Sequence, residues 1–188
     1  MNIFYLDRDP VVAAKMHCDK HVVKMILESA QMLSTAHRVL DGDEYADERG
    51  LYKMAHKNHP STIWVRTSTD NYMWLNRLFG ALCKEYTYRY GKHHASERLL
   101  VPLAKAPNGL DFNGFTDPPQ CMPELCKGED TVLAYQNYYI IEKSNLLKWT
   151  KRSVPEFFVE RKDGERTVLG LHGPAPSGRF EEGKVVNG

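Results

Sequence analysis

The sequence predicts a mainly α protein, a compact bundle of three long helices with a short N-terminal extended segment and a long Pro/Gly-rich loop. Three stretches without proline support this prediction, at residues 11–40, 61–90 and about 131–151. Each is long enough for several helical turns and is bounded by residues that start or stop helices. Residues 102–128 are rich in proline and glycine and are too long for a simple turn, which indicates a lid or a binding loop.

The size and composition of the chain are those of one soluble globular domain. The 188 residues are 42% hydrophobic and 26% charged, with a net charge of +1. We expect a single helical domain over 1–160 and a loose, polar tail over 161–188. No apolar run is long enough to span a membrane, and Met1 opens directly into the chain without a signal-peptide pattern. These features predict a cytoplasmic protein.

The four cysteines lack the spacing of a secreted disulfide framework and include no CxxC pair. We therefore expect reduced thiols. A disulfide or a metal site at Cys121 and Cys126 is a weaker alternative.

The turns between the predicted helices follow from local residue types. Residues 2–6 form an apolar extended segment, and Asp9 with Pro10 starts the first helix, which ends at Asp41-Gly42. The acidic residues 41–49 predict a loop or a frayed turn, and residues 51–57 a brief helix. The Asn58–Ser61 step then ends that helix and starts the next. His59 precedes a proline and so lies at a boundary, where side chains often point into clefts.

The first helix carries a narrow polar seam. At about 100° per residue, polar side chains fall on one line with apolar residues on both sides of it. Polar groups enclosed by apolar surface are costly unless satisfied, and they are often functional. The alternative is a solvent-facing seam with an ordinary Lys24–Glu28 pair. The seam comprises His17, His21, Lys24, Glu28, Gln31 and Thr35.

This seam offers the groups needed for acid, base or nucleophilic chemistry. A partly desolvated Lys24 beside Glu28 could attack a sugar C1′, form a Schiff base and cut a glycosidic bond. Lys20, at the edge of the seam, is a substitute amine. The competing interpretation is a structural ion pair. The predicted catalytic residues are His17, His21, Lys24, Glu28 and His59.

A divalent metal is a second possibility for the same helix. His17 and His21 are spaced i,i+4 and so share a helical face that can chelate one ion. The third ligand would be Glu28, His59 or Glu85. The stretch lacks the glutamate of the HExxH zinc motif, and the sequence identifies no other cofactor.

Substrate binding is predicted mainly from the second helix and the connector after it. Residues 84–94 interleave basic and aromatic side chains, which can pair with phosphates and stack on bases. Asn71 lies within the apolar face and needs hydrogen-bond partners, either in the first helix or to fix the helix register. The tyrosines could instead be packing residues. The predicted substrate-binding residues are Lys20, Asn71, Glu85, Tyr86, Arg89, Lys92 and His93.

The layout of residues 1–90 resembles that of the phage-type pyrimidine-dimer DNA glycosylases. The resemblance rests on an N-terminal stretch leading into a His- and Glu-bearing helix, and on the Asn58-His59-Pro60 step into a second helix. It implies DNA as the partner, the N-terminal α-amine as nucleophile and Glu28 as the assisting carboxylate. Asn2 departs from this pattern, because a residue of its size does not favour removal of Met1.

Three hypotheses follow for the function. The first is a small enzyme that excises or modifies a base in DNA or acts on a nucleotide, with its site between the first two helices. The second is a metal-dependent hydrolase that uses His17 and His21. The third is a non-catalytic phage accessory protein that binds a nucleotide or a protein partner. The sequence does not distinguish between oligomeric states.

Overall fold

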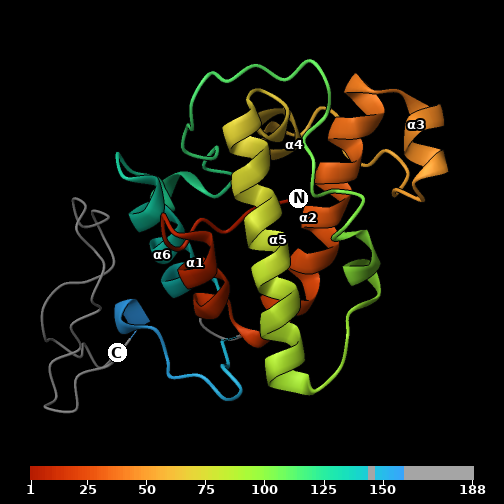
Figure 1. The fold of residues 1–188 in the computed structure, drawn as a ribbon. Helices are drawn as coiled ribbons and strands as arrows, with labels where there is room; N and C mark the ends of the chain where they lie inside the picture. The colour runs from red at the N-terminus through yellow and green to blue at the C-terminus, as the bar shows by residue number, and fades with distance from the viewer. Residues whose placement is uncertain (144–146, 159–188) are drawn as a thin grey trace, which may run out of the picture.

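The computed structural model describes residues 1–143 and 147–158 and confirms a mainly α protein (Figure 1). Those residues contain no β-strand, and none of their helices is long and apolar enough to cross a membrane. The predicted tail at 161–188 lies outside the described residues. The α-helices are α1 (Pro10–Met16), α2 (Asp19–Leu40), α3 (Asp43–Glu48), α4 (Pro60–Val65), α5 (Thr69–Tyr90) and α6 (Thr131–Glu142).

The prediction of one helix over 11–40 is wrong, because the chain breaks between α1 and α2. Asp9 caps α1 as predicted, with its side chain accepting from the amides of Val11 and Val12. Cys18 is extended, and Asp19 then starts α2. The Asp19 carboxylate accepts hydrogen bonds from Arg89 and from Thr150, both far away in sequence. These tertiary bonds override a helix propensity that favours continuity.

The second predicted helix, over 61–90, is also divided. Residues 66–68 separate α4 from α5. Ser68 is extended, and its hydroxyl accepts from the amide of Asn71 at 3.1 Å, so it is the N-cap of α5. Gly91 ends α5 in the left-handed conformation, with φ of 64°.

The prediction for residues 41–57 is reversed in the structure. The acidic stretch expected to be a loop forms α3, and residues 51–57 contain no helix. Arg38 explains this arrangement. Its guanidinium, nearly inaccessible to solvent, binds Asp43 and Asp47 of α3 and the carbonyls of Leu51 and Tyr52. The arginine therefore holds both α3 and the chain after it against α2.

The last predicted helix is shorter than expected. Asp130 caps α6 as predicted, accepting from the amides of Val132 and Leu133, but α6 ends at Glu142 and does not reach Lys151. Before α6, residues 106–123 contain no helix or strand. The described 3₁₀ turns are η1 (Ala95–Leu99), η2 (Glu124–Cys126) and η4 (Glu156–Phe158).

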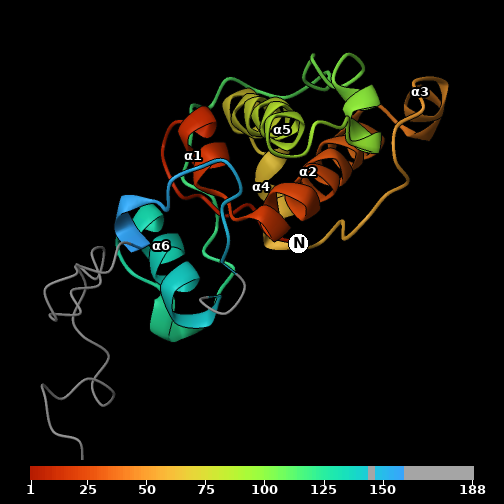
Figure 2. The same cartoon turned by 90° about the horizontal axis from the view of Figure 1, so that it is seen from below.

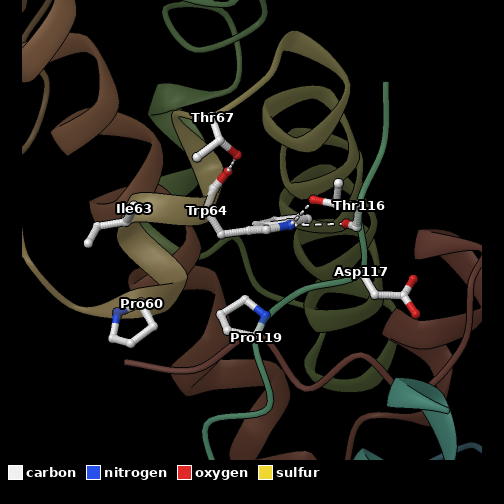
Figure 3. Close-up of a pocket in the computed structure, with 7 residues that line it drawn as sticks. All are labelled: Pro60, Ile63, Trp64, Thr67, Thr116, Asp117 and Pro119. Carbon is white, nitrogen blue, oxygen red and sulfur yellow. Dashed lines mark hydrogen bonds between the residues drawn. The ribbon is translucent and has the colours of Figure 1, made fainter. Parts of the chain in front are cut away.

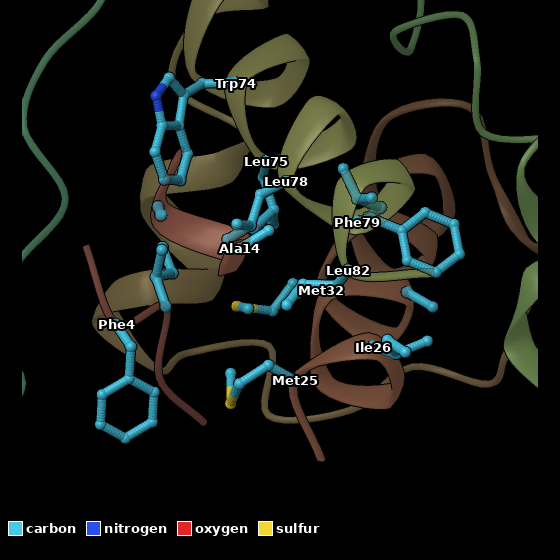
Figure 4. Close-up of a cluster of buried hydrophobic side chains, with 14 of the residues drawn as sticks. Phe4, Ala14, Met25, Ile26, Met32, Trp74, Leu75, Leu78, Phe79 and Leu82 are labelled. Carbon is cyan, nitrogen blue, oxygen red and sulfur yellow. The ribbon is translucent and has the colours of Figure 1, made fainter. Parts of the chain in front are cut away.

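The core lies where α5 packs against α1 on one side and α2 on the other (Figure 4). Leu75, Leu78 and Leu82 of α5 are fully buried, as are Met25 and Met32 of α2. Seen from below, α1 and α5 lie on one side of the molecule and the N-terminus on the other, beyond α2 and α4 (Figure 2). The molecule therefore presents two separate faces.

Trp64 of α4 provides a test of this packing. Its buried indole lies against Trp74 and Phe115 and donates to Thr116. Trp64→Ala should lower the free energy of unfolding by about 3–5 kcal/mol, because it leaves a cavity. The neighbouring Ile63 is 41% exposed, so Ile63→Ala should change stability by less than about 1 kcal/mol. Equal urea-unfolding curves for the two variants would contradict the packing.

Candidate active site

Glu28 of α2 lies between two amines. Its Oε2 is 3.9 Å from the α-amine of Met1 and accepts from the amide of Asn2 at 2.9 Å, while its Oε1 is 3.4 Å from Nζ of Lys24. The Glu28 side chain is 13% exposed, so a ligand can reach it. A carboxylate in this position can exchange protons with an attacking amine. We call Met1, Asn2, Lys24, Glu28 and His59 the Glu28 cluster.

The N-terminal segment is held in place by the core and by its own side chains. Residues 3–6 are all buried, at 4% exposure or less. The Asn2 side chain accepts from the amide of Ile3 at 2.8 Å and donates to the carbonyl of Cys121 at 2.9 Å. The start of the chain is therefore fixed beside α2. The backbone nitrogens of Met1 and Asn2 therefore both lie at the Glu28 carboxylate.

Phe4 is strained within this segment. Its φ is 54°, a conformation that bulky residues rarely adopt and that costs about 1–3 kcal/mol. Its ring stacks on His21, with centroids 4.2 Å apart and planes at 22°, and on Tyr138 at 5.8 Å. The surrounding rings thus hold Phe4 in this conformation.

His59 joins the cluster from α4. It is the N-cap of that helix, and its Nδ1 accepts from the amide of Ser61 at 3.2 Å. Burial and the positive charge of the Met1 amine lower the pKa of His59, and the charge of Glu28 opposes them only in part. His59 is therefore neutral at pH 7. With Nδ1 accepting, its Nε2 carries the proton and can donate to a ligand.

His17 and His21 are more deeply buried than we expected for members of a polar seam. His17 is fully buried and its Nδ1 bonds the carbonyl of Ala13 at 2.7 Å. His21 Nδ1 bonds the hydroxyl of Tyr139 at 2.6 Å. Burial lowers the pKa of His17 to about 4 and that of His21 to about 3, so both are neutral. Their hydrogen bonds are with these structural partners and not with Glu28 or Lys24, which leaves their predicted catalytic role without a contact to support it.

The structure gives no geometry for the predicted metal site. In the part of the chain that the structure describes, no group of three or more His, Cys, Asp or Glu side chains is arranged to hold an ion. His17 and His21 lie on either side of the break between α1 and α2, so they do not share one continuous helical face. All four cysteines are free thiols, as expected, and Cys121 does not pair with Cys126.

The predicted substrate-binding residues on α5 are mostly engaged within the fold. Asn71 is fully buried and holds Thr116 through hydrogen bonds of 2.9 and 3.0 Å. Arg89 is equally inaccessible, and all of its nitrogens bind within the protein, to Glu85, Asp19 and the carbonyl of Lys15. The polar groups of Asn71, Glu85 and Arg89 therefore all bond to other residues of the fold, which leaves their predicted binding role without a free group to support it.

The remaining predicted binding residues lie nearer the surface. Tyr86 packs between Tyr90 and His94, in keeping with the packing alternative. Lys20, Lys92 and His93 are exposed, and His93 pairs with Glu97 at 3.1 Å. Of this group only Lys20, one turn before Lys24 on α2, lies beside the Glu28 cluster.

A shallow hollow of about 450 Å³ adjoins the cluster (Figure 3). It begins at Pro60, the residue after His59, and runs across Trp64 to the segment around Thr116 and Pro119. The Trp64 indole donates to Thr116, so the floor of the hollow is fixed. The hollow offers an apolar surface next to the polar cluster.

One comparison with known proteins identifies the family. A family model described as pyrimidine dimer DNA glycosylase matches residues 1–98, just over half of the 188 residues. The chain belongs to this family. A search of curated proteins and a search of solved structures return no match to the chain.

Membership confirms the resemblance expected from the layout of the N-terminal half. The matched region contains α1 to α5 and the whole Glu28 cluster. A pyrimidine dimer DNA glycosylase is a DNA repair enzyme of the glycosylase type, and DNA is its substrate. The base-excision form of the first hypothesis therefore agrees with the family.

The predicted site residues omitted the two that contact Glu28 through the backbone, Met1 and Asn2. Helical periodicity cannot find them, because they precede the first helix. Two features of the sequence did point to them: the apolar run at 3–6, which buries the segment, and the family resemblance, which implies an amine nucleophile there. Neither feature predicted a contact with Cys121, 119 residues away.

Acid should destabilise the fold through His17 and His21. Their pKa values in the folded state are about 4 and about 3, against 6.5 for an ordinary imidazole, so below pH 6.5 the unfolded chain binds more protons. Stability then falls as the pH falls, by about 2 kcal/mol per histidine between pH 7 and pH 5. Urea unfolding at the two pH values measures this loss.

Two variants separate the buried histidines from the rest of the chain. His21→Gln should reduce the loss between pH 7 and pH 5 by about 2 kcal/mol. His93→Gln, at an exposed position, should leave it unchanged. The same pH dependence in wild type and His21→Gln would show that His21 does not titrate as its burial requires.

Proposed function

We propose that this protein is a DNA glycosylase with lyase activity, in which the α-amine at the start of the chain is the nucleophile and Glu28 is the proton-transfer group. The proposal rests mainly on the position of Glu28 Oε2, which lies 3.9 Å from the Met1 amine and 2.9 Å from Asn2 N. A base lesion of the pyrimidine-dimer type is the substrate that the family indicates.

The reaction follows from an amine and a carboxyl group placed together. The Met1 α-ammonium group first gives a proton to water, and the free amine attacks C1′ of the damaged nucleotide. The glycosidic C1′–N bond to the base breaks, and the base leaves with the electron pair and takes a proton from water. Glu28 takes a proton from the new C1′–N centre and gives it to O4′, which opens the sugar ring and forms an imine. Water then takes a C2′ proton, the C3′–O bond breaks to expel the 3′ phosphate, and a second water hydrolyses the imine to release the amine.

The α-amine is better placed for this attack than Lys24. The Met1 side chain is 2% exposed, and the next residues are buried, so packing fixes the amine before substrate arrives. Such fixing lowers the entropic cost of reaching the sugar carbon. The Lys24 side chain is 64% exposed and contacts Glu28 only at its tip. We assign to Lys24 the role of holding the phosphate or the Glu28 carboxylate.

The surroundings of the cluster suit a DNA backbone. Lys20 and Lys24 are exposed on one face of α2, and Lys57 is exposed shortly before His59. Lysines of this kind bind phosphates without reading sequence. Neutral His59 would donate from Nε2 to the sugar or to a phosphate oxygen. The hollow beside Pro60 then supplies an apolar surface for a base next to the lesion.

The metal-hydrolase alternative has less support, because the described residues form no ligand cluster. The non-catalytic alternative does not account for a fixed amine beside a reachable carboxylate. An excision assay on irradiated duplex DNA in the presence of a chelator separates both alternatives from the glycosylase. The glycosylase excises bases with the chelator present, the metal-dependent hydrolase is inhibited by it, and the non-catalytic protein excises none.

Glu28→Gln tests the carboxylate. The change is nearly isosteric, so the free energy of unfolding should stay within about 1 kcal/mol of wild type. Excision of damaged bases from ultraviolet-irradiated duplex DNA should fall by about 10²–10⁴-fold, because the amide cannot transfer the proton. Glu44→Gln, at an exposed position on α3, is the matched control and should keep wild-type activity. Full activity in Glu28→Gln would rule out this assignment.

A second pair of variants tests the amine. Two residues added before Met1 displace the α-amine by up to about 7 Å and should reduce strand cleavage by at least about 10²-fold. Lys24→Met keeps the chain start in place and should retain activity to within about tenfold. The reverse pattern, with an active extended chain and an inactive Lys24→Met, would make Lys24 the nucleophile.

A further inference from the structure

A second hollow, of about 600 Å³, lies between α1 and α5. The N-terminus lies on the other side of the molecule, beyond α2 and α4 (Figure 2), and Glu28 contacts its amine there. We call the hollow the α1–α5 groove. Its volume is in the range of small-molecule sites in proteins. The proposed glycosylase chemistry uses none of its residues.

Small residues create the groove. Gly80 and Ala81 of α5 line it, and neither has a side chain large enough to fill it. A Cβ added at Gly80 would meet only the tip of Leu100, at 3.6 Å, an ordinary contact. Val11 of α1 lines the other side and is 48% exposed. The floor is therefore apolar and accessible, and it has room for a flat ring.

Cations surround this apolar floor. Lys15, Arg77 and Lys84 are exposed, and within the described residues no carboxylate lies within salt-bridge distance of them. Among the described residues that line it, Glu85 is the only acidic one, and its two oxygens bind Arg152 at 2.8 and 2.9 Å. Burial would raise the pKa of Glu85, but the hydrogen bonds from Arg152 and Arg89 lower it, so it stays a paired carboxylate. The groove therefore favours an anion.

An aromatic ring completes the lining. Tyr88 is 48% exposed, and its hydroxyl donates to the carbonyl of Lys151 at 3.2 Å. The guanidinium of Arg152 lies 4.2 Å from the centre of the ring. Both contacts fix the ring at the edge of the groove. A fixed aromatic ring beside unpaired cations is the combination that binds the base and phosphate of a nucleotide.

We propose that the α1–α5 groove binds a nucleotide, with the base against Val11, Ala81 and Tyr88 and the phosphate on Lys15 and Lys84. The nucleotide could be a free nucleoside monophosphate or one unit of a single strand, since both present the same base, sugar and phosphate. The site is separate from the Glu28 cluster. It binds its ligand whether or not the protein excises bases.

Calorimetric titration of the full chain with deoxyadenosine monophosphate and with a tetradeoxyadenylate tests the proposal. Lys84→Glu should weaken binding of the stronger ligand at least about tenfold, because it reverses a charge at the phosphate. Gly80→Leu, which fills the groove, should do the same without a change of charge. Lys105→Glu reverses an exposed lysine outside the groove and should bind as wild type does.

The titrations distinguish a free nucleotide from a single strand, and they also show whether the groove binds neither. Tighter binding of the tetranucleotide by about tenfold or more identifies a strand, and equal binding identifies a free nucleotide. No binding of either ligand, or equal binding in wild type, Lys84→Glu and Gly80→Leu, would overturn the site. So would an equal loss in Lys105→Glu. Glu28→Gln should bind as wild type does, so failure of the glycosylase proposal leaves this result unaffected.

Discussion

Burial of the N-terminal segment is the constraint on which the proposed site depends. Residues 3–6 are covered by the core, although they form no part of a helix or sheet. Their burial brings Met1 and Asn2 beside Glu28 of α2. A terminus is normally poorly ordered unless something ties it down. Here the apolar side chains hold the segment in place, and the Asn2 side chain adds two hydrogen bonds. The same packing holds Phe4 in its strained conformation.

A buried ion-pair network holds the elements around the α1–α5 groove together, just as the N-terminal segment holds the Glu28 cluster. Arg89 of α5 bonds Asp19 at the start of α2, Glu85 of α5 and the last turn of α1. Arg152 binds the same Glu85 from a later part of the chain. Charges buried as deeply as those of Arg89 and Glu85 are stable only when paired. The network joins α1, α2 and α5, and Glu85 and Arg152 also line the α1–α5 groove.

Local sequence signals predicted the helices and their caps better than the breaks within them or the contacts between them. The caps Asp9 and Asp130 and the stop at Gly91 are local features, and all three are confirmed. The breaks at Cys18 and Ser68 were missed, because the first depends on Arg89 and Thr150, which are distant in sequence, and the second on a cap within a favourable helix.

In the candidate site, too, local features were predicted from the sequence and tertiary contacts were not. Lys24 and Glu28 are paired as their spacing predicted, and His59 is at the predicted helix boundary. His17 and His21 shared a line with them in the sequence pattern, yet they bond Ala13 and Tyr139 within the core. Periodicity gives the direction of a side chain on its own helix, but not what covers it. The nucleophile can be identified by reducing the imine with borohydride during reaction on irradiated duplex DNA and then mapping the tryptic peptides. We expect the sugar adduct on the N-terminal peptide, Met1–Arg8; an adduct at Lys24, or no adduct, would show that the α-amine is not the nucleophile.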